Sequence, residues 1–543
     1  MTLVVCMFNY LPDFVHLCQY LKYILLVAVG AFVFEKLSYA CFTDSQEPPK
    51  LPSSFPLVGH LIGMLRKHTQ YFDDLYKQNG MPIASLPILG GKIYVIWDTA
   101  LVQAGLRART MSFDAIMLQH AQGLLGLRDE SVMIARDGLL TDLMNVTKPL
   151  LLGSGLATIN MSVLNHAAET LNEILAADDT LEIPDLYHWI QTMGTLATTE
   201  ALYGAVNPLH GNRRLVEDVW LFESGLRTLG LNFFPRVIAG RAYHARERLL
   251  DAISPLFSPS PPLDGLPELT CRRAQVIRSK GIRDSREIAR IELALLHGAT
   301  VNTIPTLFWT VAHTFARPDL VARLRAEILP LVSFLPRGGA AEEGGEAQAQ
   351  ARTQAQISLK DLETTCPLLL STYREVIRLS NQAMSTRQVM ENTTVTDGGG
   401  RTYFLRAGCS VVMPATGHMG GDVWGANKND FGPERFLDWH DHKASRDRRL
   451  VYMPFGGGRH LCPGRNLAKA EILGIVAMLL LSFEMEDGAC PAEQQQPINV
   501  PTLEPARLGQ GVGKPVYLKA GGALPVRLKT RKGLQRISWK IVA

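Results

Sequence analysis

Apolar residues recur at a helical spacing along most of this chain. Five segments follow that spacing closely enough to predict helices. They are residues 71–79, 139–148, 163–177, 184–202 and 216–230. Apolar and polar positions instead alternate over residues 83–97, on both sides of Gly90 and Gly91, which predicts a β-hairpin. The pattern therefore predicts a mainly helical chain with a β-hairpin near its start.

The longest helical pattern covers residues 286–317, which are amphipathic in the first turns and almost wholly apolar in the middle. A helix of this kind must run through the core. Pro305 lies inside it and has no N–H to donate to the carbonyl of Val301, four residues earlier. We therefore predict a kink or an opened turn over residues 301–305. It is either an ordinary kink of a core helix or a place where the backbone makes room for a ligand.

The N-terminus differs from the rest of the chain. Residues 23–34 are an unbroken apolar run, and its extension on both sides reaches the roughly 20 residues that span a bilayer. A cleaved signal peptide and a buried core helix are the alternatives, but no small-residue cleavage motif follows cleanly. We predict a membrane anchor over residues 1–43. A proline-rich hinge over residues 44–60 would act as a stiff spacer after it.

The rest of the chain, residues 61–535, is predicted to be one large domain. Residues 337–356 are rich in Gly, Ala, Glu and Gln and predict a flexible surface insertion. A net charge of only +4 gives no argument for binding to nucleic acid. The eight cysteines are scattered without a close pair, which argues against a disulfide framework or a zinc module.

The candidate chemistry is concentrated in residues 455–464, which read Phe-Gly-Gly-Gly-Arg-His-Leu-Cys-Pro-Gly. Consecutive glycines let a backbone approach something flat or bulky. Cys462 stands just before a predicted helix, where the unpaired N–H groups favour a thiolate. Such a sulfur can be a nucleophile, a structural thiol or a metal ligand.

A second motif joins Glu375 and Arg378, three residues apart on one face of a predicted helix. A solvated surface pair is the simplest interpretation. The neighbouring residues are apolar, however, so we expect the pair to be buried and to need a third partner. Arg435, in the segment Phe-Gly-Pro-Glu-Arg-Phe, is the candidate.

Together these two motifs resemble the cytochrome P450 family. Phe455, Gly458, Cys462 and Gly464 match the family's haem-binding loop, and His460 stands where the family usually has arginine. Glu375, Arg378 and Arg435 are similar to the structural triad on the proximal side of the haem. The resemblance implies a cytochrome P450-like fold, mainly α with a small β domain, in which residues 61–535 form a haem-thiolate catalytic domain.

The resemblance also implies the roles of individual residues. Cys462 would be the axial thiolate, and hence the metal ligand, of haem b, with Phe455 packed against the haem face. His460 and Arg387 are candidate partners of the haem propionates. Asn302 and Thr303 are the candidate catalytic residues. The candidate substrate pocket comprises Leu296, Ala299, Thr300, Ile304, Ala383 and Met384.

The central helix departs from the family pattern. The family usually carries an acid followed by threonine there, and Val301 and Asn302 occupy these two positions. With Pro305 and Trp309 following, the segment resembles the branch of the sterol 7/12-alpha-hydroxylases and prostacyclin synthase. That branch contains both oxygen-activating enzymes and an enzyme that rearranges a peroxide.

The leading hypothesis is a monooxygenase that hydroxylates or epoxidises a lipophilic substrate such as a sterol, terpenoid, fatty acid or polyketide. Because the chain has no flavin or nicotinamide fingerprint, electrons would come from a partner, an NADPH-dependent reductase with or without cytochrome b5. The anchor would place the enzyme on the endoplasmic reticulum membrane, with its catalytic domain in the cytoplasm.

Three alternatives stay open at this point. The first is a haem-thiolate isomerase or dehydratase that rearranges a peroxide without a reductase. The second is a haem carrier or gas sensor, which would need a closed distal side. The third is a thiol enzyme in which His460 is the base for Cys462, a hypothesis that leaves Glu375 and Arg378 unexplained.

Overall fold

The structure is a computed structural model that describes a large part of the chain. The described residues are 30, 46–53, 55, 58–177, 180–259, 263–336, 353–415, 419–491, 493–504, 506, 511–516, 522–533 and 537–542. The predicted anchor over residues 1–43, Gly30 excepted, and residues 337–352 of the predicted insertion lie outside this set. Within the described part, no helix combines the length and hydropathy needed to cross a membrane.

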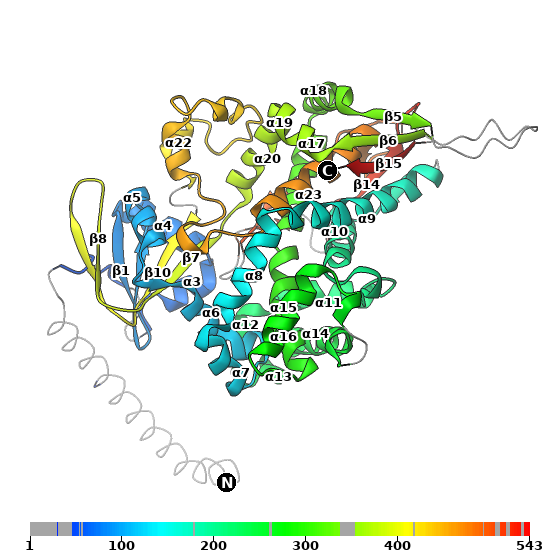
Figure 1. Cartoon of the computed structure of the whole chain (residues 1–543). Coiled ribbons are helices and arrows are strands. Elements are labelled where there is room, and N and C mark those ends of the chain that lie inside the picture. The colour runs from blue at the N-terminus through cyan, green and yellow to red at the C-terminus, as the bar shows by residue number, and fades with distance from the viewer. Residues whose placement is uncertain are drawn as a thin grey trace, which may run out of the picture. The chain divides into compact units, whose positions relative to one another are not determined.

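The chain divides into two compact units, of which the first comprises Met1–Ser112 and Thr386–Met413. Its main sheet has the strand order β1-β2-β10-β7-β3. Strands β1, β7 and β10 of this sheet are labelled in Figure 1. The sheet strands are β1 (Ile83–Ile88), β2 (Gly91–Ile96), β3 (Met111–Ser112), β7 (Met384–Val389) and β10 (Ser410–Pro414). The unit also contains α3 (Leu61–Lys67), α4 (Gln70–Asn79), α5 (Thr99–Arg107), β8 (Thr393–Thr396) and β9 (Thr402–Leu405).

The predicted hairpin is confirmed in this sheet. β1 and β2 pair antiparallel with Ile88 opposite Gly91, so Leu89 and Gly90 form the turn. Gly90 has a φ of 77°, a left-handed conformation that glycine adopts without steric cost.

The second unit, Phe113–Ser385 and Pro414–Ala543, is mainly helical. Its first helices are α6 (Phe113–Leu125), α7 (Asp129–Ile134), α8 (Leu140–Leu152), α9 (Gly155–Ala177), α10 (Leu186–Tyr203), α11 (Arg213–Ser224), α12 (Leu226–Gly230), α13 (Pro235–Ile238) and α14 (Gly240–Ile253). They are followed by α15 (Glu268–Ser279), α16 (Ser285–Thr300), α17 (Thr303–Phe315), α18 (Pro318–Ile328), α19 (Leu359–Thr365), α20 (Pro367–Ser380), α22 (Arg446–Val451) and α23 (Arg465–Ser482).

Short strands complete the second unit. β4 (Leu181–Ile183), β11 (Phe483–Asp487) and β14 (Val526–Thr530) form one sheet, β12 (Thr502–Leu503) pairs with β13 (Pro515–Val516), and β5 (Ser333–Pro336), β6 (Thr353–Ser358) and β15 (Ile537–Val542) form another. The prediction of a flexible insertion over residues 337–356 is wrong for residues 353–356, which belong to strand β6. These residues pair with β5 on one side and with β15 on the other, which the polar composition of the segment did not indicate.

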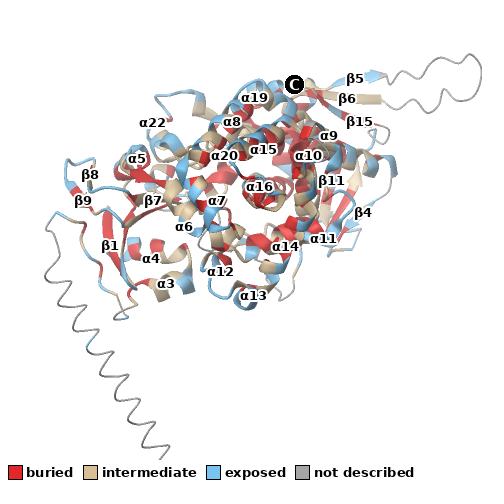
Figure 2. Ribbon diagram, turned by 60° about the horizontal axis from the view of Figure 1, so that its bottom comes forward, coloured by how far each residue is buried: buried red, intermediate tan, exposed pale blue. Residues whose placement is uncertain are grey.

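The central helix is broken where Pro305 predicts. α16 ends at Thr300 and α17 begins at Thr303, which leaves Val301 and Asn302 in a turn. α16 packs against α6, α10, α14 and α15, and buried residues run along it (Figure 2). α17 continues into the core against α10, α20 and α23. The predicted segment 216–230 is likewise two helices, α11 and α12, which meet at Gly225.

Candidate active site

The cysteine loop is shaped by its glycines. Gly456 and Gly458 have φ values of 70° and 62°, which favour glycine strongly over residues with a side chain. The loop then closes on itself, because the Cys462 N–H donates to the Phe455 carbonyl oxygen at 3.1 Å. α23 begins three residues after Cys462, so the thiol lies at the N-terminal end of a long buried helix.

The environment of the sulfur suits a metal-bound thiolate. Burial raises the pKa of the Cys462 thiol, while the N–H groups of Gly464 and Arg465 and the Arg465 guanidinium act to lower it. A metal cation would supply the positive charge that offsets the cost of burial. In the part of the chain that the structure describes, no three His, Cys, Asp or Glu side chains come together as a metal site. A single cysteine thiolate at the start of a helix is compatible with the axial haem ligand that the resemblance implies.

The cysteine loop and part of the central helix are both accessible, as contact with a bound cofactor requires. Residues 451–469, including Phe455 and Cys462, are at least partly accessible, although the rest of α23 is buried. On the central helix, Gly298 and Asn302 are exposed although the neighbouring turns are buried, and a Cβ added at Gly298 would meet nothing within 4 Å. A partly accessible cysteine loop and an accessible stretch of the central helix, in the same unit, are compatible with a flat cofactor.

The structure brings Glu375, Arg378 and Arg435 together. Arg378 donates to the Glu375 carboxylate at 2.7 and 2.8 Å, and Arg435 Nε donates to it at 2.9 Å. The Gly432 N–H adds a fourth hydrogen bond at 3.0 Å. Glu375 is fully buried, so this charge is held by partners and not by water.

α20 connects this triad to the cysteine loop. Its C-terminal neighbour Asn381 donates from Nδ2 to the Pro454 carbonyl oxygen at 2.9 Å. Tyr452 in turn donates to the carbonyl oxygen of Arg374, on the same helix, at 3.1 Å. Sequence reasoning missed both contacts, because a lone asparagine or tyrosine in an apolar segment carries no distinguishing pattern.

The predicted propionate partners have other contacts. The Nδ1 atom of His460 lies 3.6 Å from the Asp114 carboxylate, and its Nε2 accepts a hydrogen bond from Arg459 at 2.9 Å. Binding a propionate would require exchange of one of these partners. Arg387 is buried in β7 of the first unit and donates to the Thr386 carbonyl oxygen at 2.7 Å. Both roles stay predictions.

The predicted pocket residues fall into two groups. Leu296, Thr300 and Ile304 are fully buried in the core, and the Thr300 hydroxyl donates to the Leu296 carbonyl oxygen at 2.9 Å. This burial does not favour contact with a substrate. Ala299, Ala383 and Met384 are partly accessible and keep that prediction open.

The two candidate catalytic residues differ in exposure. Thr303 is buried in the first turn of α17, whereas Asn302 is exposed in the turn before it. The Asn302 carbonyl accepts from both the N–H and the hydroxyl of Thr306, at 3.2 and 2.7 Å. These bonds fix the backbone of Asn302 and leave its amide side chain at the break.

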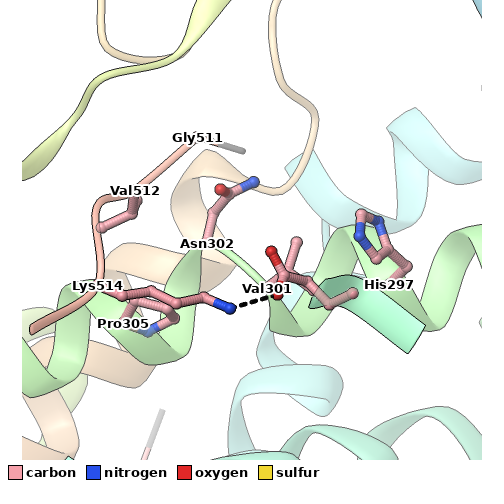
Figure 3. A pocket seen from close by; sticks show the side chains of 8 residues that line it. His297, Val301, Asn302, Pro305, Gly511, Val512 and Lys514 are labelled. Atoms are coloured by element: carbon pink, nitrogen blue, oxygen red, sulfur yellow. Dashed lines mark hydrogen bonds and ion pairs between the residues drawn. The ribbon is translucent and has the colours of Figure 1, made fainter. Parts of the chain in front are cut away.

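A small cavity of about 40 Å³ lies at this break. It is lined by Glu223, His297, Val301, Asn302, Pro305, Gly511, Val512 and Lys514. Figure 3 shows the residues of the central helix facing the segment that carries Gly511, Val512 and Lys514. Glu223 and Lys514 form an ion pair at 2.6 Å. Sequence reasoning did not single out either of them, because they are 291 residues apart and belong to no motif.

The chain is similar to known proteins over most of its length. A family model described as Cytochrome P450 matches residues 279–507. A cytochrome P450 monooxygenase of Gibberella zeae is 34% identical over 506 residues, 92% of each chain. Cytochrome P450 monooxygenase nodJ of Hypoxylon pulicicidum is 28% identical over 82% of this chain and 84% of its own.

A more distant similarity agrees with the branch predicted from the central helix. Cholesterol 7-alpha-monooxygenase of Cricetulus griseus is 25% identical over 299 residues, 52% of this chain and 55% of its own. The chain therefore belongs to the cytochrome P450 family, as a monooxygenase that binds haem through the Cys462 thiolate.

Proposed function

We propose that this monooxygenase hydroxylates or epoxidises a lipophilic substrate, with O₂ as the oxygen source and electrons from a separate NADPH-dependent reductase. The observation that carries the proposal is the broken central helix, which presents the exposed Asn302 side chain between α16 and α17 in the unit that holds Cys462. Haem supplies the site at which O₂ is bound and reduced, and a cysteine thiolate ligand favours O–O cleavage.

The chain's own residues have separate tasks in this reaction. The N–H groups of Gly464 and Arg465 stabilise the sulfur as a thiolate. The triad and Asn381 hold the loop in place. Asn302 can orient a water molecule or an oxygen-bearing substrate by hydrogen bonding, because an amide both donates and accepts.

An exposed apolar segment supports a lipophilic substrate and a membrane location. Leu231, Phe233, Phe234, Val237 and Ile238, in and before α13, are between 49% and 80% exposed. Contiguous exposed apolar side chains of this kind are typical of a membrane or partner contact. We propose that the segment inserts into the endoplasmic reticulum bilayer, to which an N-terminal anchor also attaches the chain, and that substrate enters from the lipid.

The electron donor would dock near the cysteine loop. Lys148 donates to the carbonyl oxygen of the exposed loop residue Arg459 at 3.3 Å, so one cation lies in the loop and a second lies beside it. An acidic surface on a reductase, or on cytochrome b5, would be complementary to them.

The test uses the full-length haem protein. Lipophilic compounds are first screened for changes in the absorption spectrum, and a compound that binds is incubated with reductase, NADPH and isotopically labelled O₂. We expect one labelled oxygen atom per product, with NADPH and reductase both required. Rearrangement of a peroxide without reductant, and no product from O₂, would instead favour an isomerase, the function that Val301 and Asn302 leave as the second candidate.

A further inference from the structure

The cavity at the helix break contains charges that nothing in the proposed function uses. Glu223 comes from the last turn of α11, and Lys514 comes from the segment after residue 510. Their side chains are 6% and 26% exposed, so the carboxylate is buried while the lysine also reaches solvent. Buried ion pairs add little net stability, which makes this one a candidate for a functional role.

The lysine is held firmly in place. Trp309 of α17 donates from Nε1 to the Gly513 carbonyl oxygen at 2.8 Å. On the other side, the Gln382 N–H donates to the Gly511 carbonyl oxygen at 2.9 Å. A Cβ on Gly511 would lie 2.3 Å from Asn302 Oδ1, so the segment passes directly against the Asn302 amide.

His297 lines the same cavity with a neutral ring. Burial lowers its pKa to about 4, so at physiological pH the ring is the neutral imidazole, which has a single N–H. Its Nε2 atom is buried, and no residue in the described part of the chain gives it a hydrogen bond. A polar cavity of about 40 Å³ has room for at least one ordered water that could serve this atom and the Asn302 amide.

Monooxygenation consumes protons, and the central helix offers no acid at position 301. We propose that the Glu223–Lys514 pair is the proton source for this reaction, and that it reaches Asn302 through water in the cavity. Lys514 gives a proton to the cavity water, which the Asn302 amide orients. Glu223 holds Lys514 at the cavity through the ion pair, and Lys514, which is partly exposed, takes up a new proton from solvent.

This proton relay rests on the proposed function, the insertion of one oxygen atom from O₂ into the substrate. The O–O bond breaks, and one oxygen atom is inserted into a C–H bond or added across a C=C bond of the substrate. The other oxygen leaves as water with two protons and with two electrons that NADPH supplies through the reductase. One proton comes from NADPH oxidation by way of solvent, and both reach the site through the relay.

Among the described residues, two titratable groups on neighbouring elements interact with the Glu223–Lys514 pair. Tyr187 of α10 and His297 of α16 both interact electrostatically with Glu223, and Lys514 pairs with it directly. Burial raises the pKa of Tyr187 far above neutrality, so it stays protonated throughout the working range. The ion pair is therefore the part of this cluster that can deliver protons.

The experiment compares coupled turnover, the product formed per NADPH, among variants of the full-length protein. Lys514→Met and Glu223→Gln should lower it about 10-fold, with a changed solvent isotope effect. Glu223→Asp keeps a carboxylate and should retain most of the activity. Lys514→Arg is decisive, because arginine keeps the ion pair but does not give up its proton. We expect Lys514→Arg to be as defective as Lys514→Met.

Asp218→Asn is the matched control. Asp218 is an equally buried carboxylate on α11, paired with Arg248 at 2.5 Å. This variant should keep the wild-type coupling and isotope effect. Each variant should unfold within about 3 °C of the wild type, so that a loss of coupling is not a loss of fold.

A second measurement does not depend on turnover. The C–O stretching band of the carbon monoxide complex senses polar groups and water near the bound gas. It should shift in Lys514→Met and not in Asp218→Asn. Normal coupling in Lys514→Arg with an unchanged band in Lys514→Met would overturn the relay. Failure of the wild type to consume O₂ with reductase would instead overturn the proposed function.

Discussion

A single carboxylate, that of Glu375, accepts four hydrogen bonds while fully buried. Two of its donors are the guanidinium groups of Arg378 and Arg435, which are also largely buried. Each charge is tolerable there only because the others are present, since an unpaired buried charge is strongly unfavourable. At the scale of residues, the structure on the proximal side of the haem therefore depends on the negative charge of one carboxylate, that of Glu375.

We predict that Glu375→Gln lowers the free energy of unfolding in urea by about 3–5 kcal/mol, because it leaves two buried cations without their anion. Glu363→Gln is the control. It removes an ion pair with Lys469 that is formed at a similar distance, 3.0 Å, but is more exposed. That change should cost less than about 1 kcal/mol. Equal effects of the two substitutions would contradict this account of the triad.

Glu471 gives a prediction about pH. It is buried on α23, and burial raises its pKa to about 8, against a weaker opposing effect from the Thr198 hydroxyl. The folded state then keeps a proton that the unfolded state loses near pH 4.5. Stability should accordingly fall as the pH rises from about 4.5 to 8.

The substitution Glu471→Gln should flatten that decline and raise the free energy of unfolding at pH 8, by on the order of 3 kcal/mol. Urea titrations at several pH values measure it. A wild-type profile that stays level between pH 5 and 8 would show that Glu471 is ionised in the folded protein.

At the scale of elements, α20 is the connection between the triad and the haem-binding loop. Glu375 and Arg378 lie on this helix, and Asn381 at its end holds Pro454. Asn381 also accepts the Ala383 N–H at 2.8 Å, so one side chain fixes both the loop and the chain that leaves the helix.

We predict that Asn381→Ala releases haem several-fold faster than the wild type, because it removes two hydrogen bonds worth about 1 kcal/mol each. Transfer of haem to an excess of an apoprotein acceptor measures the rate. Asn79→Ala, which removes a hydrogen bond to the Leu75 carbonyl within α4, is the control and should leave the rate unchanged. An unchanged rate in Asn381→Ala would mean that other contacts hold the loop.

At the scale of the whole molecule, the exposed apolar residues from Leu231 to Ile238 should meet the bilayer. Tryptophan placed at Phe234 should therefore be quenched by brominated lipids when the full-length protein is in proteoliposomes. Tryptophan at Met133, which is 68% exposed, is the control and should not be quenched. Equal quenching at the two positions would argue against membrane contact by this segment.

The sequence predicted the features that local patterns or motifs carry. The hairpin, the break before Pro305 and the identity of the haem ligand each depend on a few adjacent residues. It did not predict the Glu223–Lys514 pair, the contact of Asn381 with Pro454 or the pairing of residues 353–356 in β6. These depend on which distant segments the fold places side by side, and no local propensity encodes that.

The central claim is that Cys462 is the thiolate ligand of haem iron, and the absorption spectrum of the reduced carbon monoxide complex tests it most directly. The wild type should show the red-shifted Soret band of a thiolate-ligated haem, and Cys462→Ser should lose it even where haem is retained. A Soret band at the same position in Cys462→Ser would contradict the account.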